Sequence, residues 1–447
     1  MQQQTHPASA VVVVIEGLGT NLVGAYGSSS AITPALDQMA SQGVLLDQCF
    51  LDSQQLPEQL RSLWTAAHAL QTGPLPWNLW QGFAARWGGR SSASGMARLL
   101  TDSPQVAELA EQLGCPQITL IAPRSTSPSI LLPAGGPRHE AIEDLAQGPA
   151  EDSSQCAVME LLATAAAELA SGPPGLVWIH SRGLRHPWDA PLDMRAQFAD
   201  PEDPDPPDCI ELPSIAIDAE TDPDFVVGWG QVAAAQAAVI DEGLTVLRDT
   251  VAQRPDATAW AWLVTTLGGV PLGEHGRLGW GHQQLVGSEL HTATIIVPAQ
   301  PLAIGLRRPE LFQLPDIAAT LAGLLELELP STVWGQNALA LGAAQSPDRW
   351  LHELRMAMLS GKQGNWLRTP AWSAILENLE AGSHGDTGND QLFVKPEDRW
   401  EVSQIADRRR DIVELHRQLL PLFAAAAKCG QRSALPVLDD DLLNLLR

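Results

Sequence analysis

The sequence predicts an α/β fold, with a mainly parallel central sheet, helices on both faces of the sheet and a smaller α+β unit at the C-terminal end. Three observations support this class. Val11–Ile15 is a continuous β-branched run, which is typical of a strand buried on both faces. Strand-like and helix-like stretches then alternate, which implies crossover connections between parallel strands. From about residue 345 this alternation stops, so we expect an α/β domain over 1–344 and a subdomain over 345–447.

The first predicted strand is followed by a clear helix signal. Thr33 is a candidate N-cap, Pro34 suits the first helical turn, and Gly43 is a candidate stop. Further units each pair a helix with the strand that follows it. These pairs are expected over 105–114 and 117–122, over 157–170 and 175–180, and over 226–251 and 259–266.

The last part of the chain closes the predicted domain and forms the subdomain. An amphipathic helix is expected over 314–327. In the subdomain, 374–380 and 391–396 have the pattern of strands, and 406–427 has the pattern of a helix. The stretch 199–224 is rich in Pro and Asp and is expected to be an exposed loop.

Composition and charge limit the class of protein and its partners. Apolar residues make up 45% of the 447 residues and charged residues 18%, as in globular proteins. The formal net charge of −25 leaves no basic stripe for nucleic acid or an anionic membrane surface. The 5 cysteines lie far apart, which favours buried free thiols over a disulfide framework. The N-terminal apolar run is too short for a signal peptide or a membrane span, so we expect a cytoplasmic protein.

Several stretches, taken in order, resemble the sulfatase branch of the alkaline phosphatase superfamily. "VVVVIEGLG" resembles that family's opening strand and metal loop, and "RSLWTAAHA" resembles the segment after its nucleophile. "WIHSRGLRHPWDAP" is similar to its strand-end histidine loop, and "LVTTLGGVPLGEHG" to its second metal corner. "LPDIAATLAGLLEL" resembles its closing helix, and "QLFVKPEDRWEVSQIADR" its small C-terminal subdomain. The resemblance implies that family's fold over nearly the whole chain.

The resemblance also implies a metal site, whose first corner is altered here. Members of the family hold a divalent cation, usually calcium, in an oxygen-rich cage. Where the family has two successive Asp residues, this chain has Glu16 and Gly17. Glu16 is therefore the lone candidate metal ligand, by analogy with the single Asp of the related phosphodiesterase branch. The alternative is a polar residue that makes a cap or turn contact at the end of a strand.

The second metal corner and the nucleophile of the family are both replaced in this chain. Leu267 and Gly268 occupy the positions of an Asp and a His or Asn, and neither offers a metal-binding side chain. The family's nucleophile is a Cys or Ser that is oxidised to an aldehyde hydrate. Its position falls on Leu56 or on Pro57, depending on which residues of the motif are aligned. Ser53 is close in sequence but out of register.

Other polar residues match a pocket of the family. The resemblance places His180 and His186 in the strand-end loop, where an imidazole often faces sulfate, and Arg61 near the lost nucleophile. His275 lies in the retained Gly-Glu-His-Gly, and His282 lies close to a basic position of the family. The alternative for each histidine is a hydrogen-bonding role in a turn.

Tryptophan is unusually frequent, with 15 residues against one tyrosine. Trp77, Trp80 and Trp87 cluster in "PWNLWQGFAARW". One interpretation is packing of this segment onto the sheet. The other is an aromatic platform for a ligand or a protein partner.

These substitutions predict a sulfatase-like protein that has lost catalysis and now has a binding or regulatory role. Loss of the metal ligands and loss of the nucleophile are independent defects, and either would impair the reaction. No cofactor is expected, although the family would use calcium, and the partner would be a small anion or another protein. The alternative is a divergent sulfuric-ester or phosphoric-ester hydrolase that uses Glu16 and nearby histidines with a divalent metal.

Overall fold

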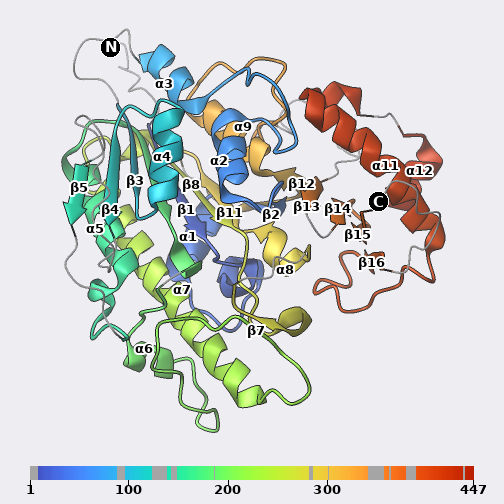
Figure 1. The fold of residues 1–447 in the computed structure, drawn as a ribbon. Helices are drawn as coiled ribbons and strands as arrows, with labels where there is room; N and C mark the ends of the chain where they lie inside the picture. Colours follow the sequence, from blue (N-terminus) through green and yellow to red (C-terminus); the bar gives the residue numbers. More distant parts are fainter. Residues whose placement is uncertain are drawn as a thin grey trace.

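The computed structural model describes residues 9–87, 96–122, 138–141, 148–185, 187–280, 285–300, 302–340, 357–361, 364–378, 389–435 and 438–446. Its main feature is a mixed, mostly parallel sheet in the order β10-β2-β11-β8-β1-β6-β3-β4-β5, with β12 also paired to β2 (Figure 1). The strands are β1 (Ser9–Glu16), β2 (Val44–Phe50), β3 (Met96–Thr101), β4 (Ile118–Ala122), β5 (Arg138–Ala141), β6 (Gly175–Ser181), β8 (Trp260–Leu267), β10 (His291–Thr292), β11 (Thr294–Val297) and β12 (Leu306–Gln313).

The predicted first strand lies inside the sheet, as the β-branched run indicated. β1 pairs in parallel with β6 on one side and with β8 on the other. Because both edges and both faces of β1 are covered, all of its residues are buried. β11 is antiparallel to both β8 and β2, so the sheet is mixed and not uniformly parallel. The α/β class with a mainly parallel sheet is confirmed.

Helices cover both faces of the sheet. They are α1 (Pro34–Gln42), α2 (Leu56–Thr65), α3 (Leu79–Trp87), α4 (Pro104–Gln112), α5 (Ala157–Ser171), α6 (Leu192–Ala196), α7 (Pro223–Ala252), α8 (Gly287–Leu290) and α9 (Leu314–Leu324). The short strands β7 (Ile215–Ala216) and β9 (Arg277–Leu278) form a separate antiparallel pair. The 199–224 stretch is otherwise mostly irregular and partly exposed, as its composition indicated.

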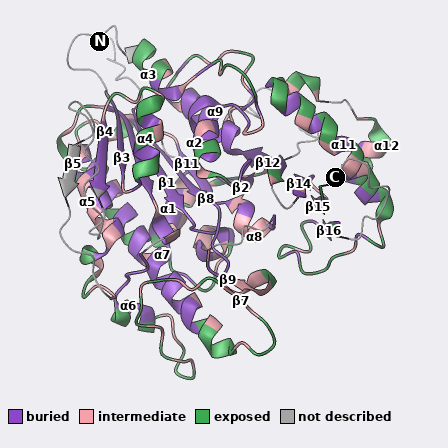
Figure 2. Cartoon of the chain, viewed as in Figure 1, coloured by how far each residue is buried: buried purple, intermediate pink, exposed green. Residues whose placement is uncertain are grey.

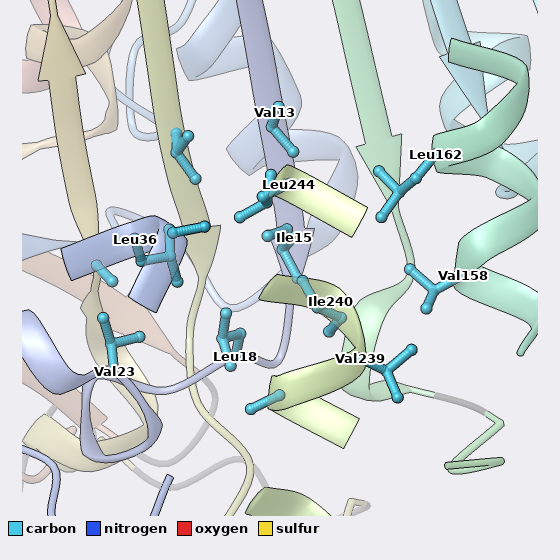
Figure 3. Packing of buried hydrophobic residues seen from close by; sticks show 14 of the residues in the cluster. Val13, Ile15, Leu18, Val23, Leu36, Val158, Leu162, Val239, Ile240 and Leu244 are labelled. Atoms are coloured by element: carbon cyan, nitrogen blue, oxygen red, sulfur yellow. The ribbon is translucent and has the colours of Figure 1, made fainter. Parts of the chain in front are cut away.

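Alternate residues of β1 point to the two faces of the sheet and join two different cores. Val12 and Val14 pack with residues of α2, α3, α4 and α9. Val13 and Ile15 pack with residues of α1, α5 and α7, among them Ile240 (Figure 3). Figure 2 shows the buried sheet between partly exposed helices. The two cores fix β1 in register, and so they fix where its carboxyl end lies.

The C-terminal part contains a small antiparallel sheet and further helices. Its strands are β13 (Ala357–Gly361), β14 (Gly364–Arg368), β15 (Trp372–Leu376) and β16 (Gln391–Val394), and its helices include α11 (Arg410–Cys429) and α12 (Asp440–Leu446). This part lies beside the β2 and β12 edge of the large sheet (Figure 1). The expected boundary at residue 345 falls outside the described residues.

Several local expectations differ from the structure in detail. Thr33 does precede α1, but its hydroxyl accepts a hydrogen bond from the backbone N–H of Gly24 and does not cap the helix. The strand expected over 374–380 begins two residues earlier, at Trp372, and ends at Leu376. All 5 cysteines are free, but Cys209 and Cys429 are exposed and not buried as expected.

The tryptophans of the α3 region pack into the core. Trp80 is fully buried, and its ring lies 5.5 Å from that of Trp64 and 5.9 Å from that of Trp178. Trp77 is 8% exposed. Both side chains therefore have the packing role, and neither forms an exposed platform. The Trp87 side chain lies outside the described part of the chain.

Among the described residues, no helix is both long enough and apolar enough to cross a membrane.

Candidate functional site

Glu16 is the last residue of β1 and stands where the chain leaves the centre of the sheet. It pairs in register with Leu267, the last residue of β8. The chain turns at Gly17, which has φ +78, and its backbone N–H donates to the carbonyl of Leu267 over 3.1 Å. The carboxyl ends of parallel strands form the usual site in such folds. The two residues aligned with the first and second metal corners are thus direct neighbours.

His180, near the end of β6, and Arg185, in the turn that follows it, hold the Glu16 carboxylate. His180 Nε2 lies 3.0 Å from Glu16 Oε1, and Nε2 is the donor because a carboxylate only accepts. Arg185 Nε lies 2.7 Å from Glu16 Oε2 in an ion pair. The side chains of Glu16 and His180 are 1% and 0% exposed, whereas that of Arg185 is 35% exposed. Both carboxylate oxygens therefore have a partner within the protein.

The position of Arg185 depends on a tight turn and on an aromatic ring. Arg185 ends a short 3-10 turn that begins at Gly183, where φ is +52 and a Cβ would lie 2.4 Å from the carbonyl oxygen of Glu16. The guanidinium lies 4.5 Å from the centre of the Trp280 ring, a distance at which a cation is attracted to the ring face. Trp280 is itself fixed by donation from Nε1 to the carbonyl of Leu184 over 3.1 Å. Gly183 and Trp280 together position the Arg185 guanidinium against the Glu16 carboxylate.

A second carboxylate supports the same loop. Asp102 accepts hydrogen bonds from the backbone N–H of Arg182 over 2.8 Å and from the hydroxyl of Ser181 over 3.3 Å. Burial raises the pKa of Asp102 above its usual value, and the nearby charge of Arg182 acts in the opposite direction. Asp102 thus orients the loop that carries Arg185.

The second corner is apolar and closely packed. Leu267 is 2% exposed and belongs to the core that lies under α2 and α9. Gly268 has φ +69, and a Cβ there would lie 2.5 Å from the carbonyl oxygen of Glu289. A cavity of about 30 Å³ remains beside these residues; its wall includes Gln54, Gln59, Arg185 and Trp280. The backbone at this corner leaves no room for the side chain that the family would place at Gly268.

The segment aligned with the nucleophile forms the start of α2. Leu56 is the first residue of this helix and is half-buried, while Pro57 follows it and is exposed. Ser53 is 2% exposed, and its hydroxyl donates to Glu58 and accepts from the backbone of Gln55. Arg61 donates to the carbonyls of Ala69 and Gln71, so it braces the turn after α2.

Asp52 is a buried acid that the sequence did not single out. It accepts hydrogen bonds from the hydroxyl of Ser62 over 2.7 Å and from the backbone N–H of Ala69 over 2.8 Å. Burial nevertheless raises the pKa of Asp52 to about 7. The carboxyl group therefore links β2 to the end of α2 in the interior.

The remaining predicted histidines do not join the Glu16 cluster in the part of the chain that the structure describes. His275 is exposed, with φ +54, in a 3-10 turn. His186 and His282 lie outside the described residues. Sequence reasoning missed Arg185, Trp280 and Asp102. Arg185 could have been identified from the sequence "HSRGLRH", because it is a basic residue two positions after Gly183, which follows the strand-end histidine.

The cluster offers few metal-binding groups. Glu16 and His180 are adjacent, but within the described residues no three histidine, cysteine, aspartate or glutamate side chains come together as a metal site. Calcium takes about six to eight oxygen ligands, and structural zinc takes four. The described residues of the cluster fit neither ion.

Solved structures resemble this chain over nearly its full length. The phosphonate monoester hydrolase of Agrobacterium radiobacter gives a TM-score of 0.68 at 14% sequence identity, with 94% of this chain and 95% of that chain covered. A 2-O GAG sulfatase gives 0.66 at 14% identity, with 98% and 96% covered. A protein solved with its substrate D-glucosamine-2-N,6-O-disulfate gives 0.64 at 12% identity, with 95% and 98% covered.

These likenesses define the fold class. The chain has the α/β fold of the sulfatases and of the phosphonate monoester hydrolase, as the sequence predicted. No family model matches the sequence, and no curated protein does.

Proposed function

We propose that this chain is a sulfatase-like protein without hydrolytic activity, with a binding or regulatory role. One observation carries the proposal: the Glu16 carboxylate, the lone candidate ligand of the first metal corner, is paired with Arg185 and His180. A side chain already neutralised in this way is a poor ligand for a second cation.

Electrostatic repulsion also disfavours binding of a metal ion next to the Glu16–Arg185 ion pair. Two like unit charges 4 Å apart repel by about 4 kcal/mol at an effective dielectric constant of about 20, and a divalent ion doubles that repulsion. A cation that bound Glu16 would have to displace the Arg185 guanidinium or accept it as a neighbour. Leu267 at the second corner contributes no carboxylate that would offset that repulsion.

The nucleophile side of the site supports the same conclusion. Neither Leu56 nor Pro57 has a side chain that can be oxidised to an aldehyde or can attack an ester. Ser53 is buried, and its hydroxyl donates to Glu58. Loss of one well-placed electrostatic group typically lowers the rate about a hundred- to a thousandfold, and here the attacking group is replaced as well.

The alternative is a divergent ester hydrolase centred on Glu16 and His180. The observation that favours it is the buried Nδ1 of His180, which has no hydrogen-bond partner among the described residues. This nitrogen is available for a hydrogen bond to a substrate. Such an enzyme would need its attacking group from water or from another part of the chain.

A metal analysis combined with activity assays separates the two functions. We expect substoichiometric calcium and zinc in the purified protein, and no turnover of an aryl sulfate, an aryl phosphate or a phosphonate monoester. Bound metal near one equivalent, or turnover that a chelator abolishes, would establish the hydrolase. In that case Glu16→Gln should abolish turnover, while Glu274→Gln, which alters a neighbouring loop carboxylate, should leave it intact.

A further inference from the structure

A separate cavity of about 270 Å³ lies between the large sheet and the C-terminal part. One wall comes from the loops near β1, from β2 and from α8; the other comes from the segment after β16 and from the end of β14. Its volume is close to the lower end of the roughly 300–1,000 Å³ found for small-molecule sites. It shares no lining residue with the small cavity beside Leu267.

Most charges around this cavity are paired. Arg307 lies 2.6 Å from Asp47, and Lys395 lies 3.1 Å from Glu401. Glu401 also accepts a hydrogen bond from the backbone N–H of Gly287 over 2.8 Å, so it is held firmly against Lys395. These two pairs contribute no net charge to the lining.

Two arginines in the lining are left without a carboxylate. The Arg368 guanidinium donates to Gln48 Oε1 over 2.7 Å and to backbone carbonyls after β14, all of which are neutral acceptors. Arg399 donates to the carbonyl of Tyr26 over 2.9 Å. Among the described residues, no carboxylate lies within ion-pairing distance of either one. The lining therefore carries a surplus of positive charge in a chain whose formal net charge is −25.

Burial and nearby charges both act on the titratable groups of the lining. Arg368 is 4% exposed, and burial lowers its pKa to about 10. Burial lowers the pKa of His291 to about 3, and the charges of Arg399, Arg368 and Lys395 act in the same direction. The charge of Glu401 acts on Arg368 in the opposite direction, but without a carboxylate in ion-pairing contact the desolvation of Arg368 is offset only in part. An anion in the cavity would add further attraction.

The rest of the lining is suited to an organic body. Tyr26, Phe50 and Trp400 contribute aromatic surface to the cavity. Ser288 also lines it, and its buried hydroxyl has no hydrogen-bond partner among the described residues. Sites of this kind combine apolar walls with a few convergent polar groups.

We propose that this cavity binds a small organic oxyanion, in which a carboxylate or phosphate group faces Arg368 and Arg399 and an apolar body lies against the aromatic wall. Arginine suits this role because its guanidinium remains charged and its fork of N–H donors matches an oxyanion. The site is distinct from the Glu16 cluster, so the inference does not depend on whether hydrolysis has been lost.

Titration of the full-length protein with defined anions tests the proposal. Benzoate and phenyl phosphate are the test ligands, inorganic phosphate tests the charged group alone, and benzamide is the neutral control at constant ionic strength. We expect saturable binding of the aromatic anions by calorimetry, weaker binding of inorganic phosphate and no binding of benzamide. Absence of saturable binding by all three anions would overturn the proposal.

A pair of charge-matched variants identifies the site. Arg399→Gln should weaken binding about tenfold or more, because hydrogen bonds to charged groups are among the strongest. Arg410→Gln removes the same charge from an exposed residue at the start of α11 and should leave the affinity unchanged. Equal losses in both variants would refute a specific site. Arg368→Gln should show the largest loss, but Arg368 also holds three carbonyls, so Arg399→Gln is the decisive variant.

Discussion

Replacement of Arg185 by methionine should measure how far the buried Glu16 depends on its internal counter-ion. Methionine keeps apolar contact with Trp280 but leaves the carboxylate, which is 1% exposed, with His180 alone. Breaking a fully buried ion pair costs about 3–5 kcal/mol. Because the Arg185 side chain is 35% exposed, solvent already screens part of this interaction. We therefore expect a loss of about 2–3 kcal/mol in the free energy of unfolding.

Urea denaturation of three variants tests this expectation. Arg86→Met breaks the exposed pair with Glu326, whose side chains are 45% and 66% exposed, and should cost at most about 1 kcal/mol. The double variant Glu16→Gln with Arg185→Met should be more stable than Arg185→Met alone, because it leaves no unpaired buried charge. If Arg185→Met costs no more than Arg86→Met, or if the double variant is the least stable, the argument for an internal counter-ion is wrong.

Three further predictions follow from other buried groups. Native Asp52 keeps its proton up to about pH 7 whereas the unfolded chain loses it near pH 4, so stability should fall as pH rises between these values. Asp52→Asn should flatten that part of a stability profile measured by thermal unfolding; an unchanged slope would contradict the raised pKa. The double variant Leu267→Asp with Gly268→His should be less stable, because a Cβ at position 268 would lie 2.5 Å from the carbonyl oxygen of Glu289. It should show no chelator-sensitive turnover of an aryl sulfate, because Leu56 and Pro57 still lack an oxidisable side chain; metal-dependent turnover would contradict this. Trp80→Ala should cost about 3–5 kcal/mol in urea denaturation, as expected for a fully buried aromatic side chain, and a change below about 1 kcal/mol would contradict core packing.

The general fold could be predicted because its main signals are local. A β-branched run marks a buried strand, and alternation with helices implies parallel neighbours, so Glu16 was placed at the correct edge of the sheet. The antiparallel strand β11 was missed because it is four residues long and its pairing with β8 and β2 is a long-range contact. No periodicity in a short segment reveals which strand it will join.

The site was only partly predictable, for a different reason. The resemblance predicted that Leu267 and Gly268 stand at positions where the family binds metal, but it did not predict which side chains would surround Glu16. Arg185 reaches Glu16 because Gly183 allows a close turn and Trp280 supports the guanidinium, and both depend on the folded backbone. The cavity lined by Arg368 and Arg399 could not be predicted from the sequence for the same reason. It depends on the folded backbone, because Arg368 and Gln48 are 320 positions apart in the chain.

The pairing of Glu16 with Arg185 also changes how the centre of the fold responds to its surroundings. A metal ion stabilises a protein by mass action, so its contribution rises and falls with the free concentration of the ion and disappears in a chelator. A counter-ion joined to the chain cannot be diluted or exchanged, and it is present in every molecule as soon as the chain folds. The positive charge next to Glu16 is therefore set by the sequence and is independent of the supply of metal.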